Sequence, residues 1–93
     1  MTLARPLFAL AVLLALPAPL QAGELCRVAD PTGTPLNVRT APNFKIVGAL
    51  RNGTRVEILQ VVRGDDGKQW AFIADAADGR AHGWVFRSYL DCR

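Results

Sequence analysis

Hydrophobic and polar residues alternate in short runs along residues 36–59, a pattern that predicts strands separated by turns. In LNVR, residues 36–39, apolar and polar positions alternate with the period of two that is typical of a half-buried strand. A mostly apolar run follows at residues 45–50, and a second alternating run follows at residues 55–58. Asn52-Gly53 between these runs predicts a tight turn, because both residues tolerate positive φ. No part of this stretch has the spacing of an amphipathic helix.

Further strands are predicted on both sides of this stretch. The longest covers residues 54–63, and its apolar side chains change face after Ile58, so that Leu59 and Val61 are expected on the opposite face; such a change indicates a bulge or bend. The other expected elements are strands at residues 26–29, 68–74 and 81–86, hairpin turns at 64–67 and 75–80, and a terminal 3-10 turn at 88–90. Short strands at close spacing predict an all-β fold, a small barrel of about five to six short strands.

The first 22 residues have the pattern of a secretory signal peptide. Arg5 supplies a positive start, Leu7 to Leu16 is an unbroken apolar run, and Leu20-Gln21-Ala22 ends in a small residue suited to cleavage. A transmembrane helix would need roughly 20 apolar residues, and this run is much shorter. We therefore expect a signal peptide at residues 1–22, one domain at residues 23–93, no transmembrane segment after cleavage, and a periplasmic or secreted location.

Charge argues against nucleic acid as a ligand. Arg5 is the only one of the 11 Lys and Arg residues within the leader, so ten remain against eight Asp and Glu, a net charge of +2. These ten cations are scattered along the chain, whereas nucleic-acid binders usually cluster them on one face. We therefore expect no nucleic-acid partner. We also expect the protein to be a monomer.

Cys26 and Cys92 predict a disulfide that joins the two ends of the domain. Export would place both in an oxidising compartment, where small domains often depend on such a bond. In the chain-entropy model, closing a loop of this length stabilises the fold by about 4 kcal/mol. The alternatives are a catalytic cysteine paired with His82, and a zinc site. The catalytic pair is less favoured, because a terminal cysteine with a single matching partner is far more often structural. The zinc site is less favoured, because two cysteines and one histidine fall short of four ligands and lack ligand spacing.

No set of residues indicates catalysis or a metal site. Ser88, the only serine, lies close to His82 in sequence but has no nucleophile-elbow glycines around it. Paired-carboxylate catalysis and a calcium loop are the remaining possibilities, but the acidic residues concerned fall in turns, where aspartate usually bonds to nearby backbone; they are Asp65, Asp66, Asp75 and Asp78. We therefore expect no enzyme activity, cofactor or metal.

The aromatic residues give the clearest indication of a ligand. Trp70 and Phe72 share one face of their strand, with Ala71 and Ile73 on the other, and Trp84 and Phe86 are likewise paired. Aliphatic residues are sufficient for the core, namely Leu36, Val38, Leu50, Ile73, Val85 and Leu90. The tryptophans either complete that core or form a partly exposed groove. We favour the groove, because exposed aromatic surface flanked by polar residues is typical of binding sites.

The motifs LNVRTAP at residues 36–42, GTRVEIL at residues 53–59 and GWVFRSYL at residues 83–90 resemble the bacterial SH3-like (SH3b) family. The resemblance implies an SH3-like barrel with a shallow groove for peptide, in many members a peptidoglycan stem peptide or cross-bridge. It places the ligand-binding residues at Trp70, Trp84 and Tyr89, with Phe44 and Phe72 at the edges of the groove. Three motif residues are expected to be structural: Asn37 bonding to backbone, Arg39 tying down a neighbouring loop, and Gly83.

Two functions are compatible with this sequence. The first is a stand-alone, non-catalytic module of the cell envelope that binds peptide or peptidoglycan. The second is a secreted or periplasmic protein–protein interaction or inhibitor domain with no wall ligand. Burial of both tryptophans would favour the second.

Overall fold

The computed structural model describes residues 23–93 and shows an all-β domain. The predicted signal peptide, residues 1–22, lies outside the described residues. The elements are β1 (Glu24–Val28), β2 (Leu36–Arg39), β3 (Ile46–Leu50), β4 (Arg55–Arg63), β5 (Gln69–Asp75), β6 (Ala81–Phe86), the 3-10 turn η1 (Arg87–Tyr89) and β7 (Leu90–Asp91). The predicted fold class is confirmed, but the described residues form seven strands rather than five to six. The additional strand, β7, is two residues long, too short for any periodicity in the sequence to reveal it.

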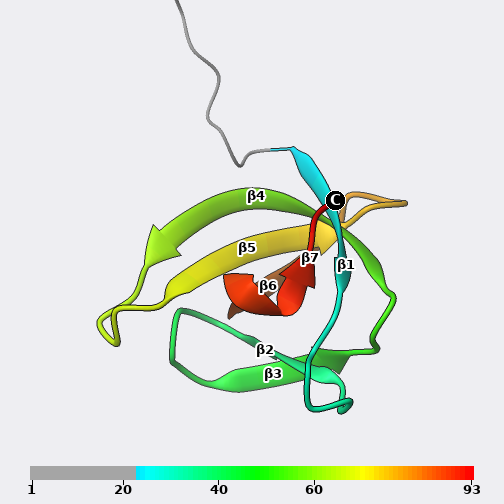
Figure 1. Cartoon of the computed structure of the whole chain (residues 1–93). Coiled ribbons are helices and arrows are strands. Elements are labelled where there is room, and N and C mark those ends of the chain that lie inside the picture. Colours follow the sequence, from blue (N-terminus) through cyan, green and yellow to red (C-terminus); the bar gives the residue numbers. More distant parts are fainter. Residues whose placement is uncertain (1–22) are drawn as a thin grey trace, which may run out of the picture.

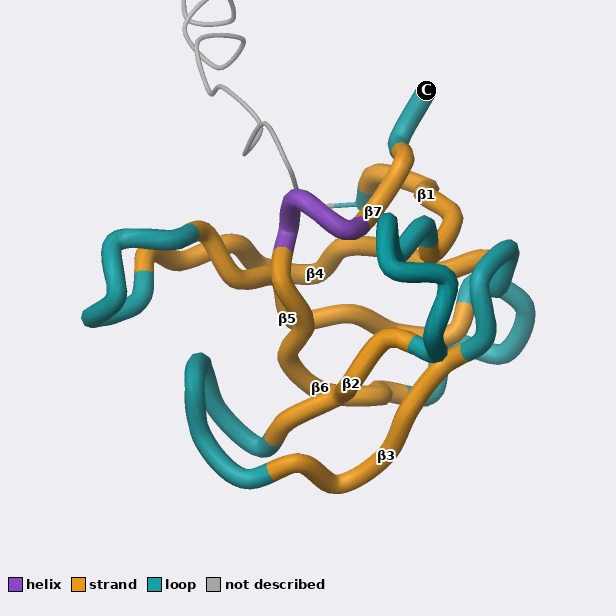
Figure 2. Tube along the Cα trace, turned by 60° about the horizontal axis from the view of Figure 1, so that its bottom comes forward, coloured by secondary structure: helices purple, strands orange, loops and turns teal. Residues whose placement is uncertain are grey.

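All strand pairs are antiparallel, in the order β3-β2-β6-β5-β4-β1-β7. The sheet curves on itself, so that β4 and β5 arch on one side of the interior and β2 and β3 lie on the other (Figure 1). The one helical segment within residues 23–93, η1, joins β6 to β7 (Figure 2). This curvature gives each central strand one face toward the interior and one toward the outside.

The predicted bulge in β4 is present. The register with β5 shifts between Ile58 and Gln60, and Leu59 is 40% exposed. Val61 packs against the buried core, so the expectation that Val61 shares the face of Leu59 is wrong. The extra residue of the bulge explains the difference. One inserted position moves every later side chain of β4 to the other face, so that Val61 points inward.

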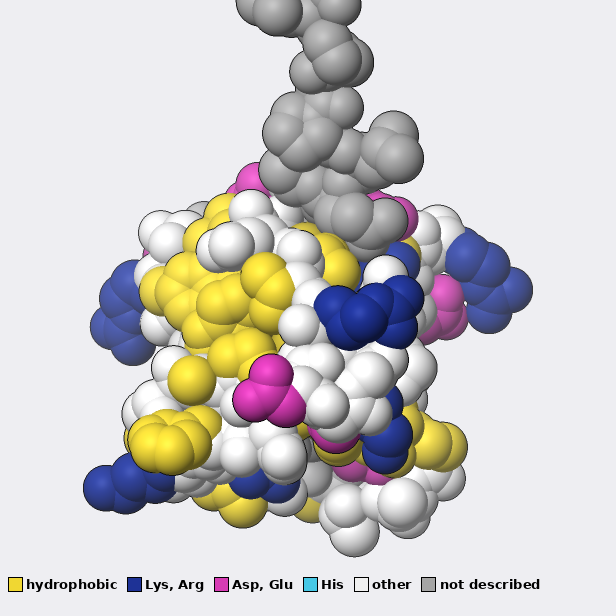
Figure 3. All heavy atoms as spheres, turned by 90° about the vertical axis from the view of Figure 1, so that its left-hand side faces the viewer, with side chains coloured by type: hydrophobic (Ala, Val, Ile, Leu, Met, Phe, Trp, Pro, Cys, Tyr) yellow, Lys and Arg dark blue, Asp and Glu magenta, His cyan; other side chains and the backbone are white. Residues whose placement is uncertain are grey.

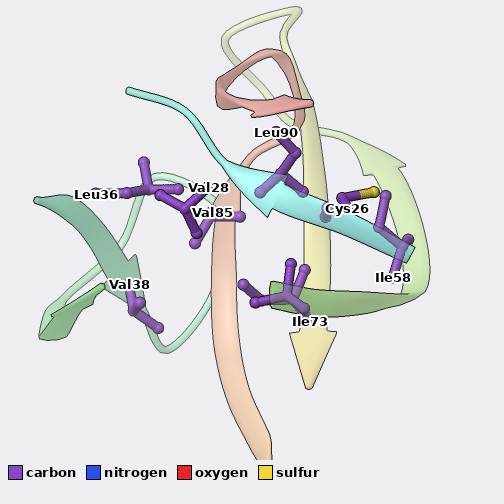
Figure 4. Packing of buried hydrophobic residues seen from close by; sticks show 10 residues of the cluster. Cys26, Val28, Leu36, Val38, Ile58, Ile73, Val85 and Leu90 are labelled. Atoms are coloured by element: carbon purple, nitrogen blue, oxygen red, sulfur yellow. The ribbon is translucent and has the colours of Figure 1, made fainter. Parts of the chain in front are cut away.

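The core is made of aliphatic side chains from the inward faces of the strands (Figure 4). Five of the six predicted core residues are buried, and the sixth, Leu50, is partly buried against them. The structure adds Cys26, Val28, Val56, Ile58 and Ala71. Fully burying one Val, Leu or Ile contributes about 1.5–3 kcal/mol.

The predicted disulfide is present and joins Cys26 of β1 to Cys92, which follows β7. The bond spans 66 positions of sequence. It therefore ties the first strand of the described domain to the last one, next to the β1–β7 pairing.

Candidate ligand-binding face

The large aromatic side chains of β5 and β6 lie on the outer face of the sheet. Trp70 is directly opposite Phe86, and Phe72 is directly opposite Trp84. Opposite residues on antiparallel strands share a face, and the intervening Ala71 points into the core. The ring centroids of the two pairs are 4.2 Å and 5.3 Å apart. Tyr89 of η1 adds an edge-on contact to Phe86 at 5.4 Å. We call this set of five residues the aromatic face.

Trp70 is fully buried, at 0% exposure, although it is not part of the aliphatic core. The β4–β5 turn covers it: a Cβ on Gly64 would lie 2.8 Å from the indole nitrogen, which donates a hydrogen bond to Asp66 Oδ1 at 3.4 Å. The Arg39 guanidinium lies 5.9 Å from the centre of the indole ring. The expectation that Trp70 contributes an exposed ring to the groove is therefore wrong, because the β4–β5 turn, the Arg39 side chain and the Phe86 ring together cover the indole.

The other four members of the aromatic face are half-buried and keep part of their surface in solvent. They are Phe72, Trp84, Phe86 and Tyr89. The two tryptophans therefore lie in different environments, with Trp70 fully buried and Trp84 partly exposed. The alternative in which both tryptophans are buried is not what the structure shows.

Polar and charged residues border this aromatic surface. Arg39 of β2 stands opposite Trp84, and Gln60 of β4 stands opposite Phe72. One row therefore crosses four strands, with an aromatic pair between a cation and an amide. Lys68 places its ammonium 5.2 Å from the centre of the Phe86 ring. Sequence analysis missed Gln60 and Lys68, because only the register of the strands brings them to this face.

A hollow of about 510 Å³ lies beside these residues, between the start of β5 and η1. Polar residues line it, with both their polar groups and their apolar stems: Lys68, Gln69, Arg87 and Ser88. On the side of the molecule from which the β4–β5 turn projects, hydrophobic side chains gather into a broad patch, with Lys or Arg to either side and an acidic side chain at its lower edge (Figure 3). Planar rings with cations at their edges suit a ligand that has both apolar and anionic groups.

The three motif residues have different roles in the structure. Arg39 Nη1 donates a hydrogen bond to the Phe44 carbonyl oxygen at 2.7 Å, so Arg39 does hold the β2–β3 loop. Asn37 is exposed, and within residues 23–93 its side chain makes no hydrogen bond, so its expected bond to backbone is wrong. Gly83 has φ of 139° and lies against Arg39 and Val38, where a side chain has no room.

Phe44 lies in the β2–β3 loop and is 66% exposed. Its neighbours Ile46 and Val47 on β3 are also about half exposed. β3 is an edge strand of the sheet, paired with β2 only. Phe44 is therefore part of an apolar edge beside the aromatic face, and no ring contact joins it to that face among the described residues.

The other candidate groups are held in structural interactions. Asp75 accepts hydrogen bonds from the Ala77 and Asp78 amides, at 2.8 Å and 3.2 Å, and these bonds are the main cause that lowers its pKa. His82 Nε2 lies 3.7 Å from Asp75, a pairing that sequence analysis missed. Glu24 lies close to both cysteines, but their sulfurs are bonded to each other and are not thiolate ligands.

A comparison with protein families identifies the domain. The model described as "Bacterial SH3 domain" matches residues 34–91, more than half of the 93-residue chain. The chain belongs to the bacterial SH3 domain family. The matched region of this SH3 domain includes the whole aromatic face, whereas β1 with Cys26 precedes it. No curated protein and no solved structure matches the chain. Residues 23–93 contain no helix with the length and hydropathy needed to cross a bilayer.

Proposed function

We propose that this bacterial SH3 domain is a non-catalytic binding module of the cell envelope, and that its ligand is a peptide of peptidoglycan. The observation that carries the proposal is the Phe72–Trp84 pair, two partly exposed rings 5.3 Å apart on the outer face, with Arg39 opposite Trp84. Rings of this kind hold a peptide at low entropic cost, because they have few rotatable bonds. Arg39 and Lys68 supply cations for the carboxylates of a wall peptide.

We also propose that the chain is exported, to the periplasm or beyond the cell, with residues 1–22 as its signal peptide. The Cys26–Cys92 disulfide supports export, because such bonds persist in oxidising compartments and are rare in the cytosol. Cys26 is buried and Cys92 is partly buried against the core, near the two ends of the domain, which fits a structural bond. Finding the purified protein with residues 1–22 still attached after export would contradict this part of the proposal.

The test is retention of the exported, oxidised protein on insoluble peptidoglycan, with Trp84→Ala as the variant. Trp84 is partly exposed, so its removal takes away ligand contact at less cost to folding than removal of the fully buried Trp70. We expect retention to fall by at least about fivefold, the effect of losing a central aromatic contact. Leu59→Ala is the matched control, because Leu59 is 40% exposed on β4, does not belong to the aromatic face and lines neither hollow of the domain.

Circular dichroism and a thermal melt would show that both variants fold. Absence of retention by the wild-type protein would overturn the wall-peptide proposal, as would equal retention of the wild-type and Trp84→Ala proteins. Release of soluble fragments from the wall by the protein alone would overturn the non-catalytic assignment.

A second candidate function is a protein–protein interaction or inhibitor domain with no wall ligand. The observation that favours it is the apolar edge formed by Phe44, Ile46 and Val47. Contiguous exposed hydrophobic side chains are typical of surfaces that meet another protein. Two results together would support this function over the first: the wild-type protein does not bind peptidoglycan, and the Phe44→Ser variant no longer binds a protein partner that the wild-type protein binds.

A further inference from the structure

Two arginines stand directly opposite each other on neighbouring strands, outside the aromatic face. Arg27 of β1 is opposite Arg55 of β4. The adjacent pair, Cys26 and Val56, points into the core, so both arginines point outward, and both are exposed. Like charges directly opposite each other on a sheet are destabilising. The sequence therefore keeps a pair that costs stability in the unliganded domain.

Neighbouring carboxylates offset this pair only in part. Asp91 of β7 is opposite Arg27, and the charge of Arg27 helps to lower the pKa of Asp91, but the two Asp91 oxygens accept hydrogen bonds from Arg93 at 3.1 Å and 3.3 Å. Asp75 is engaged by backbone amides of its own loop. Within residues 23–93, neither Arg27 nor Arg55 has a carboxylate oxygen within 4 Å of its guanidinium. Two guanidinium groups with open donors thus face the same region of solvent.

That region is a hollow of about 630 Å³ at the β1, β4 and β7 side of the domain. Both arginines line it, together with Arg93, with the carboxylates of Asp75 and Asp91, and with Leu25, which projects from the same face of β1 as Arg27. Three arginines against two carboxylates leave this lining with one positive charge in excess. Side chains on directly opposite residues begin only about 5 Å apart, so two guanidinium groups at these positions reach a single oxyanion. Guanidinium forks match the oxygens of carboxylate and phosphate groups in pairs.

We infer that this hollow, with Arg27 and Arg55 on its wall, binds an oxyanion group of a ligand, either a carboxylate or a phosphate. The bound anion offsets the repulsion between the two arginines, and Leu25 contacts an apolar part of the same ligand. The site lies on different strands from the aromatic face, and the inference does not rest on the proposed wall-peptide function.

The test is a titration of the exported, oxidised, isotope-labelled protein with inorganic phosphate. The NMR signals of the amide and guanidinium groups are recorded at each phosphate concentration, and sodium chloride keeps the ionic strength constant. We expect saturable shifts at Leu25, Arg27 and Arg55, and about tenfold weaker binding in Arg27→Gln. Arg51→Gln is the matched control, since Arg51 lies in the β3–β4 turn and does not line the hollow. A parallel titration with acetate separates the two ligand classes: saturation by both anions admits carboxylates, and saturation by phosphate alone restricts the class to phosphates.

Thermal unfolding supplies a second measurement. In chloride buffer Arg55→Gln should melt above the wild-type protein, by roughly 1–5 °C, because the like-charge pair is gone, whereas Arg27→Gln also loses the attraction between Arg27 and Asp91. Phosphate should raise the melting temperature of the wild-type protein and leave that of Arg27→Gln nearly unchanged. Non-saturable shifts of equal size at all arginines, or equal stabilisation of both proteins by phosphate, would overturn the inference.

Discussion

Gly83 of β6 lies so close to Arg39 of β2 that a Cβ on residue 83 would stand 2.7 Å from the Arg39 carbonyl oxygen. The same atom would lie 2.8 Å from Val38 Cγ1. Gly83 also has φ of 139°, a backbone conformation that residues with side chains rarely adopt. This close approach brings β6 against β2 at the point where Arg39 faces Trp84. Glycine at position 83 therefore fixes the geometry beside the aromatic face.

Substituting Gly83→Ala should lower the free energy of unfolding by about 2–5 kcal/mol, from backbone strain and from overpacking against β2. Urea unfolding followed by circular dichroism measures this change. Gly48→Ala on β3 is the control, because a Cβ there meets no heavy atom within 4 Å and should leave stability nearly unchanged. Equal midpoints for the two variants would show that the approach of β6 to β2 relaxes at little cost.

The two tryptophans, the only ones in the chain, should respond differently to a quencher in water. In Trp84→Phe the remaining Trp70 is fully buried, so its emission should be blue-shifted and resist acrylamide. In Trp70→Phe the remaining Trp84 should be quenched several-fold more strongly. Comparable quenching in the two folded variants would contradict the burial of Trp70 beneath the β4–β5 turn.

Removing the Trp70 ring altogether should destabilise the domain. Trp70→Ala leaves a cavity beneath the β4–β5 turn and removes the partner of Asp66, so the free energy of unfolding should fall by about 3–5 kcal/mol. The same urea titration on Trp84→Ala provides the comparison, and the half-exposed ring should cost clearly less. A Trp70→Ala variant as stable as Trp84→Ala would mean that the buried indole contributes little packing energy.

Sequence periodicity predicted which side of each strand faces the core, but it did not predict what covers the other side. The alternation of Trp70 with Ala71 correctly placed the indole outside the core. Its burial depends on Gly64, on Asp66 and on Arg39, which is 31 positions away in sequence and arrives through the β2–β6 pairing. The same limit applies to the Arg27–Arg55 pair, because only the register between β1 and β4 sets those residues opposite each other.

The disulfide could be predicted from the positions of two cysteines alone, and its contribution to stability can be measured directly. Reduction, or the double substitution Cys26→Ala and Cys92→Ala, should lower the free energy of unfolding by up to about 4 kcal/mol, because the unfolded chain regains the freedom of a long loop. Mass measurement after alkylation without reductant should find no free thiol. Urea midpoints that are the same with and without reductant, in samples shown by alkylation to be reduced, would contradict this role.

Asp75 fixes the loop between β5 and β6 through its carboxylate. The hydrogen bonds from the Ala77 and Asp78 amides lower the pKa of Asp75 below its usual value, with a smaller contribution from the charge of His82. The main cause that lowers the pKa of Asp66 is a hydrogen bond from the Lys68 backbone amide. The main cause that lowers the pKa of Asp91 is a hydrogen bond from the Arg93 side chain. All three carboxylates therefore favour the folded state when they are ionised.

The sign of the pH dependence follows from these shifts. Each folded-state pKa lies below the unfolded value of about 3.9, so the stabilisation is complete above that pH and is lost as the pH falls through the folded-state pKa. We expect the free energy of unfolding of the wild-type protein to decrease below about pH 4. In Asp75→Asn this decrease should be shallower. The variant should therefore be clearly less stable than the wild-type protein at neutral pH and nearly as stable at pH 2. Urea titrations from pH 7 to pH 2 measure this. Asp65→Asn is the control, since the Asp65 carboxylate accepts no hydrogen bond within residues 23–93. If Asp75→Asn and wild-type protein lose stability in parallel as the pH falls, the amide bonds to Asp75 do not contribute to the acid sensitivity of the fold.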